Sequence, residues 1–298
     1  MKQKIAILLA VLVLFIGAYL GRHWLKDQWE LFTKPELPKP TAFTDQEQPA
    51  ADDSINADLP SGPPSHIEGG ISESENFKLE SSPQTTEPPE IDKPVDPLAG
   101  DVDIPEELNL DVPWMSQAPN ANWDYPYQEA CEEASMIMVD EFYKMNSGKI
   151  PVDEADKKIL DLVKYQEDEL GYYRDTTAEE TAQILRDYFN YRDVRVLPLT
   201  SALDIQAVLA RGYPVIIPFW GKAIGNPNYR NGGPLYHMMV MKGYTKDDQF
   251  ITGDPGTRKG QDYVYAFDRI MEAAHDWNDG DVQNGKKVMI IVLPNQIP

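Results

Sequence analysis

The stretch from residue 31 to residue 107 constrains the fold most, because its residue types do not build a hydrophobic core. Pro, Ser, Thr, Asp and Glu dominate it, with few large apolar residues, no sustained periodicity, and proline pairs at 63–64 and 88–89. Such a composition predicts a disordered acidic linker; a glycosylated stalk or a small domain are the alternatives. As a coil of about 75 residues it would reach roughly 50 Å.

The residues before this stretch predict a membrane anchor. Residues 5–20 are almost entirely apolar, including a few alanines and one glycine, and they follow Lys2 and Lys4. This run is slightly short for a spanning helix, but Gly21 and Trp24 can extend it. Because no small-residue cleavage site follows, residues 1–30 are expected to be an uncleaved signal anchor rather than a cleaved signal peptide. The short N-terminal tail favours a single-pass protein of the cell membrane, with the bulk of the chain extracytoplasmic.

The remaining residues, 108–298, are long enough for one domain with its own core. The chain of 298 residues has a formal net charge of -22, so it is a poor candidate for binding nucleic acid, which relies on Lys and Arg. Its single cysteine rules out an intramolecular disulfide.

Within this domain the periodicity of apolar residues changes along the chain. Three- and four-residue spacing predicts helices first, and runs rich in Val, Ile, Met and aromatic residues predict strands later. We expect helices at 131–145, 152–166, 177–189, 202–210 and 268–277, and strands at 194–199, 214–220, 236–244, 250–252 and 287–293. Helices followed by strands indicate the α+β class.

Cys131 lies where an irregular run turns into the first helical pattern. A thiol in the first turn of a helix lies near unpaired N–H groups and the positive end of the helix dipole, and both favour the nucleophilic thiolate. The carboxylates of Glu129, Glu132 and Glu133 oppose it, so an imidazolium partner would be needed. The alternative is that Cys131 is simply a buried small hydrophobe.

His237 is the natural partner among the four histidines, because it opens a buried-looking strand after a glycine turn. Asp254 follows 254 − 237 = 17 residues later, in Gly253-Asp254-Pro255. A strand, a turn and a returning strand would bring Asp254 back beside His237, where a carboxylate orients the imidazole. The alternatives are a strand-edge histidine and a turn aspartate.

The sequence does not favour a zinc site or a serine hydrolase. One cysteine and scattered histidines give none of the usual zinc spacings, and no Gly-x-Ser-x-Gly elbow appears. No cofactor and no metal are therefore expected.

The motifs resemble a known family when they are taken in order. Residues 110–117 (LDVPWMSQ), then Cys131 opening a helix, Tyr236-His237 opening a strand and Gly253-Asp254-Pro255 are similar to the bacteriocin-processing cysteine peptidases, family thirty-nine (C39-like), in their stand-alone branch. The resemblance implies a papain-like fold with N-terminal helices packed on an antiparallel sheet. It also implies a Cys131 nucleophile, a His237 base, an Asp254 orienter and a glutamine at the oxyanion hole.

Two glutamines compete for that last role. Gln117 ends the stretch that resembles the family, and Gln128 lies three residues before Cys131; we favour Gln117 because its surrounding motif matches. The family usually has glycine after the cysteine, where this chain has Glu132 and Glu133.

The expected anchor and the resemblance together predict a membrane-tethered, extracytoplasmic cysteine peptidase that hydrolyses peptides through a thiol acyl-enzyme. Its partners would be a peptide or protein substrate and the membrane. The alternatives are a non-catalytic peptide-binding module on the same fold and a transglutaminase-like amide transferase.

Overall fold

A computed structural model describes residues 35–43, 96 and 98–295 of the chain. The predicted anchor at 1–30 and most of the predicted linker lie outside these residues. Among the described residues, none of the helices is both long and apolar enough to cross a membrane. Residues 1–43 and 102–298 form one compact unit and residues 44–101 another, and the fold below is that of the first unit.

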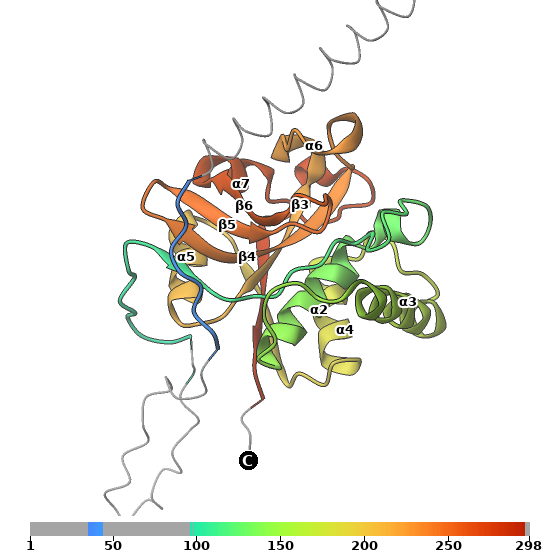
Figure 1. The fold of residues 1–298 in the computed structure, drawn as a ribbon, viewed down its shortest axis with the longest axis horizontal. Helices are drawn as coiled ribbons and strands as arrows, with labels where there is room; N and C mark the ends of the chain where they lie inside the picture. The colour runs from blue at the N-terminus through green and yellow to red at the C-terminus, as the bar shows by residue number, and fades with distance from the viewer. Residues whose placement is uncertain (1–34, 44–95, 97, 296–298) are drawn as a thin grey trace, which may run out of the picture. The chain divides into compact units, whose positions relative to one another are not determined.

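The described part of the chain builds a seven-stranded antiparallel sheet in the order β2-β7-β3-β4-β5-β6, with the short β1 also paired to β4 (Figure 1). The strands are β1 (Leu108–Asn109), β2 (Asp193–Pro198), β3 (Val215–Trp220), β4 (Tyr236–Thr245), β5 (Gln249–Gly253), β6 (Gln261–Ala266) and β7 (Val288–Leu293).

The central strand β4 is buried along its whole length. Its N-terminal half pairs with β3 from Trp220↔Tyr236 onward, but β5 joins it only from Val240. Residues 236–239 therefore have no β5 partner, and this open side of β4 can receive groups from outside the sheet. At the other end of β4, β1 comes so close to Gly243 that a Cβ there would lie 2.3 Å from the Leu108 carbonyl oxygen.

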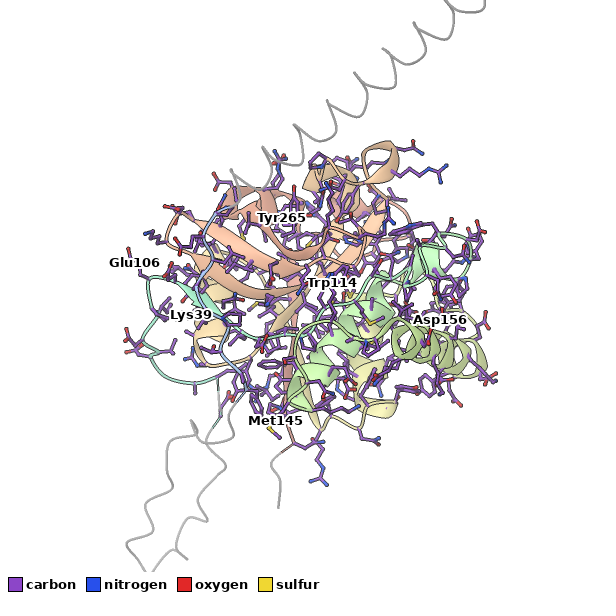
Figure 2. The ribbon with its side chains drawn as sticks, viewed as in Figure 1. Lys39, Glu106, Trp114, Met145, Asp156 and Tyr265 are labelled. Carbon is purple, nitrogen blue, oxygen red and sulfur yellow. The ribbon has the colours of Figure 1, made fainter. Side chains whose placement is uncertain are left out.

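Helices cover the sheet, and α2 (Cys131–Tyr143) packs directly on β4. The sequence predicts one apolar face for this helix, yet every residue from Cys131 to Phe142 is buried. The reason is that α3 (Val152–Glu169) and α4 (Ala178–Asp187) pack against α2 as well. Figure 2 shows Trp114 close to α2 and the sheet, where its indole N–H donates to the Asp254 carbonyl oxygen at 3.1 Å.

The start of α4 follows a local sequence motif. Thr177 caps α4 in a capping box with Glu180, because each side chain accepts a hydrogen bond from the other residue's backbone N–H, as that motif requires. The remaining helices are α5 (Ala202–Ala210), α6 (Gly221–Ile224) and α7 (Phe267–Ala273), with 3₁₀ turns at Tyr127–Glu129, Arg230–Gly232 and Val282–Asn284. The α+β prediction is confirmed, with the thiol-bearing helix packed on an antiparallel sheet as a papain-like fold requires.

Three elements differ from the prediction. The sequence analysis missed β6 and α6, and α7 ends at Ala273 instead of continuing to residue 277. Ala274 instead forms a β-bridge with Phe219, and the His275 backbone N–H donates to the Pro218 carbonyl at 3.0 Å. Pairing with β3 therefore competes successfully with continuation of the helix.

Part of the predicted linker contacts the domain. Residues 35–43 lie against the compact unit, and Thr41 forms a parallel β-bridge with Leu110. At the far end of the predicted linker, the Pro105 carbonyl accepts a hydrogen bond from the Tyr244 hydroxyl at 3.0 Å. Within the predicted linker, residues 35–43 and Pro105 therefore contact the domain through hydrogen bonds and, at Phe43, aromatic rings, although their composition is polar and proline-rich.

Candidate functional site

His237 and Asp254 are brought together by neighbouring strands, as the sequence predicts. His237 is the second residue of β4, and Asp254 follows the last residue of β5. Imidazole Nε2 lies 2.9 Å from Asp254 Oδ1, and both side chains are buried, at 1% and 0% exposure. Since an ionised carboxylate only accepts, Nε2 is the protonated nitrogen and Nδ1 is left as the acceptor.

The Asp254 carboxylate is held by donors from several elements. Oδ1 also accepts from the Gly256 backbone N–H at 2.9 Å. Oδ2 accepts from the Tyr265 hydroxyl at 2.7 Å, the Tyr229 hydroxyl at 2.8 Å and Asn226 Nδ2 at 3.1 Å. Burial alone would raise the pKa of Asp254, but the bonds and charge of His237 and the two tyrosine hydroxyls lower it below its usual range. Asp254 is therefore a fixed anion.

Close packing keeps this pair in place. A Cβ on Gly256 would lie 2.7 Å from His237 Cε1 and 3.2 Å from Asp254 Oδ1, so this position has no room for a side chain. The Tyr229 ring meets the imidazole edge-to-face with 5.4 Å between centroids. The imidazole is thus held against rotation by packed neighbours.

Cys131 is the first residue of α2 and lies beside the open side of β4. The backbone N–H of Met238, the residue after His237, is close enough to the thiol to lower its pKa. The first-turn N–H groups of a helix have no intrahelical acceptor, and Ala130 before Cys131 provides no side-chain cap for them. The structure therefore places the thiol next to the His237 strand and at a helix N-terminus.

The thiol itself contacts Glu132. Cys131 Sγ donates to Glu132 Oε2 at 3.0 Å, and within the described residues no hydrogen bond joins it to His237. Burial, followed by the charge and hydrogen bond of Glu132, raises the pKa of the Cys131 thiol well above its usual value. In this arrangement the thiol is neutral at pH 7.

Glu132 and Glu133 are unusual because they are fully buried carboxyls. Burial and, for Glu132, the neighbouring Glu133 raise both pKa values, that of Glu133 to about 8. Glu133 Oε1 accepts from Gln166 Nε2 at 2.5 Å, whereas Glu132 Oε1 and Glu133 Oε2 have no partner among the described residues. The helix start beside the thiol therefore carries carboxyls that hold protons more tightly than usual.

Gln117 reaches the site but uses both of its amide hydrogens elsewhere. Its Nε2 donates to the Tyr127 and Gln128 carbonyls at 3.0 Å each, and its backbone N–H donates to the Pro255 carbonyl at 3.0 Å. Gln117 thus ties the approach to α2 to the turn after Asp254. The exposed Gln128 side chain instead donates to Glu129 at 3.1 Å.

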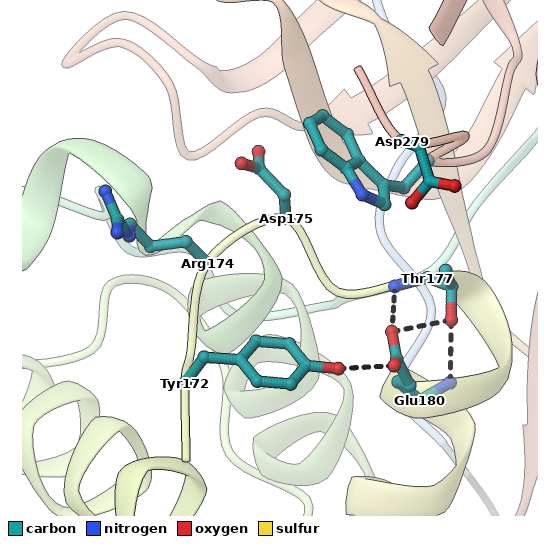
Figure 3. A pocket seen from close by; sticks show the side chains of 7 residues that line it. Tyr172, Arg174, Asp175, Thr177, Glu180 and Asp279 are labelled. Carbon is teal, nitrogen blue, oxygen red and sulfur yellow. Dashed lines mark hydrogen bonds between the residues drawn. The ribbon is translucent and has the colours of Figure 1, made fainter. Parts of the chain in front are cut away.

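A pocket of about 570 Å³ opens near the site, between the α3–α4 connection and the loop after α7 (Figure 3). Trp277 on one wall packs edge-to-face on Tyr236, the residue before His237, with 5.6 Å between ring centroids. Asp175 on the other wall is close enough to Glu132 to raise its pKa. The lining residues are Tyr172, Arg174, Asp175, Thr177, Glu180, Trp277 and Asp279.

Sequence reasoning missed several of these residues. Asn226, Tyr229 and Tyr265 come from outside the quoted motifs and converge on Asp254 only in the fold. The contact between Cys131 and Glu132 had a sequence signal in the acidic residues around the thiol, but nothing in the sequence showed that Glu132 is buried. No group of three or more possible metal ligands occurs in the described part of the chain.

Comparisons with known proteins bear on the domain rather than on individual residues. The family model described as Peptidase_C39 like family matches residues 109–283. A crystal structure described as that of a C39-like peptidase from Bacillus anthracis is similar over 63% of this chain and 98% of its own, with 13% identity and a TM-score of 0.40. No curated protein matches the chain.

Proposed function

The chain belongs to the Peptidase_C39 like family, and from that premise we propose that it is a cysteine peptidase in which Cys131, His237 and Asp254 hydrolyse peptide bonds. The observation that carries the proposal is the buried hydrogen bond between His237 Nε2 and Asp254 Oδ1, on the strand beside the thiol. It fixes the imidazole tautomer that can accept a proton at Nδ1.

The chemistry divides into two steps with the same residues. The thiol turns from Glu132, gives its proton to His237 Nδ1 and attacks the scissile carbonyl carbon; the imidazolium then protonates the leaving amine, and an acyl-enzyme remains. His237 next takes a proton from water, whose oxygen attacks the thioester, and returns the proton to Cys131. The Asp254 anion stabilises the imidazolium in both steps.

The oxyanion that forms needs donors aimed at it. The backbone N–H of Cys131, at the uncapped start of α2, supplies one. Gln117 remains our choice for a second, on the condition that its Nε2 exchanges one of its two carbonyl acceptors for the oxyanion.

A peptide library offers many sequences at once, so this test does not depend on choosing one substrate. Peptides made by digesting a proteome are incubated with the full-length protein between pH 5 and pH 9, and new termini are identified by mass spectrometry. We expect cleavage by the wild type and its loss in Cys131→Ala and His237→Ala, because the covalent route needs both groups. Equal cleavage by Cys131→Ala would exclude the thiol mechanism.

A non-catalytic peptide-binding module is the second candidate, and one observation favours it. The thiol donates to Glu132, and its raised pKa keeps it neutral, as in an inert buried cysteine. The two candidates differ in the library experiment, since a binding module would retain peptides on the folded protein and produce no new termini.

Membrane tethering and extracytoplasmic placement are also proposals, supported by the apolar run at residues 5–20. Protease added to intact cells should then remove residues 108–298 from the cell surface. Protection of these residues until the cells are lysed would contradict the placement.

A further inference from the structure

Residues 35–43 make specific contacts with the domain although they lie far from it in sequence. The Thr41 backbone N–H donates to the Asn109 carbonyl at 2.8 Å, and the Asp111 backbone N–H donates to the Thr41 carbonyl at 2.8 Å. Asn109 Nδ2 donates to the Pro38 carbonyl at 3.0 Å. These bonds run along one extended stretch, the blue segment of Figure 1, on which Figure 2 labels Lys39.

The segment is chemically suited to such a site. Pro35, Pro38 and Pro40 favour an extended backbone and have no N–H, so their backbones can only accept hydrogen bonds. Thr41 is the first residue after these prolines with an N–H, and it is the one that enters the parallel bridge with Leu110. Asn109 is only 3% exposed and is thus committed to this contact.

An aromatic contact closes the end of the segment. The Phe43 ring packs edge-to-face on Phe142 and Tyr143 of α2, with 5.7 and 5.2 Å between ring centroids. Phe142 is otherwise a core residue, 1% exposed, so Phe43 covers an apolar surface that its absence would open to water.

The covalent path from Phe43 back to the domain is long. It runs through residues 44–101, after which Leu108 and Asn109 pair with the central strand β4.

We propose that Asn109, Leu110, Phe142 and Tyr143 form a docking site for an extended proline-rich segment, and that residues 35–43 occupy it within the same chain. This contact then fixes residues 1–34 to the domain independently of the connection through residues 44–101. Through this site only a short stretch of chain separates residue 34 from the domain. A free linker of about 75 residues would instead allow a reach of roughly 50 Å.

A cut in the connection tests the proposal on the full-length chain. A specific protease site replaces residues 65–71, and the detergent-solubilised protein is cut and separated by size under native and denaturing conditions. We expect the two pieces to migrate together natively and apart in denaturant. The double variant Thr41→Pro/Phe43→Ala should separate natively, because it loses the bridge donor and the aromatic contact. The matched control Lys39→Ala, at an exposed position of the same segment, should behave as the wild type.

A second readout uses the uncut chain and does not depend on how long the cut pieces stay together. The Asp111 amide should exchange slowly with deuterium in the wild type and at least tenfold faster in the double variant, because Thr41 supplies its acceptor. Native separation of the wild-type pieces together with fast exchange at Asp111 would overturn the proposal. Pieces that stay together in the double variant would overturn it as well, since other contacts would then hold residues 1–34.

Discussion

Cys131 and Glu132 share one hydrogen bond, and that bond adds to the burial of the thiol in setting its resting reactivity. Burial of the thiol, followed by the buried Glu132 carboxyl whose Oε2 lies 3.0 Å from Sγ, raises the pKa of Cys131. The Met238 N–H acts in the opposite direction but does not prevail, since the pKa of the thiol is raised. A neutral thiol at rest follows, and activation requires that it leaves Glu132.

Replacing Glu132 by glutamine should make the thiol more reactive. Glu132→Gln keeps the size of the side chain and removes a carboxyl that can become negatively charged beside Sγ, so the pKa of Cys131 should fall. Alkylation by iodoacetamide at pH 7 should then be about tenfold faster for each unit by which the pKa falls. Glu133→Gln is the matched control, because Glu133 is equally buried but makes no hydrogen bond to the thiol, and its effect should be smaller. An unchanged or slower rate in Glu132→Gln would contradict this explanation.

Asp254→Asn should destabilise the fold as well as slow the chemistry. Five donors converge on the two carboxylate oxygens, and an amide group must turn its NH₂ toward some of them. The cost should be about 1–3 kcal/mol in urea unfolding at pH 7, the usual range for an unsatisfied buried donor. Tyr265→Phe removes only one donor, so it should lower the free energy of unfolding less than Asp254→Asn does. A larger loss in Tyr265→Phe would contradict the role of Asp254 as the shared acceptor of these donors.

This cost should depend on pH in a defined direction. The pKa of Asp254 is lowered in the folded protein, so its stabilising contribution is complete above the ordinary carboxyl pKa of about 3.9. This contribution is lost as the pH falls through the lowered pKa that Asp254 has in the folded protein. The difference in unfolding free energy between wild type and Asp254→Asn should therefore narrow below about pH 4.

At the level of elements, the start of α2 combines a nucleophile with buried acids. Its start was predictable, because apolar spacing begins at Cys131, whereas it ends at Tyr143 and not at the predicted residue 145. The Thr177 cap of α4 follows a local motif. The burial of Glu132 and Glu133 was not predictable, since α3 and α4 cover that face only in the assembled fold. The edge strand β6 was missed for a similar reason: it is half exposed and is defined by its pairing with β5.

Glu133→Gln should stabilise the protein more at pH 8 than at pH 5. Burial raises the pKa of Glu133 to about 8, so between its ordinary value and pH 8 the folded state binds more protons than the unfolded state. The contribution of Glu133 to the free energy of unfolding therefore decreases as the pH rises through that window. Glutamine does not ionise, so the variant lacks this decrease. Urea unfolding at both pH values measures the gain. Glu179→Gln, an exposed position in the first turn of α4, is the control and should show no such difference.

On the scale of the whole molecule, His237 and Asp254, two of the proposed catalytic residues, lie close together, and the groups that support them come from distant segments. The strand, turn and returning strand between His237 and Asp254 made their meeting predictable. Asn226, Tyr229 and Tyr265 approach Asp254 through long-range packing that leaves no motif. Residues 35–43 likewise belong to the domain because of contacts with Asn109 and Phe142 that composition does not show.

The most direct test of the central claim is to look for the acyl-enzyme on Cys131. A peptide cleaved in the library experiment is converted to its ester or thioester, mixed with the full-length protein and quenched in acid within its first turnovers. Mass spectrometry of the peptide that contains Cys131 should show an added acyl group in the wild type and none in His237→Ala, since the thiol then lacks its base. Hydrolysis of the ester without any acyl group on Cys131 would contradict the mechanism.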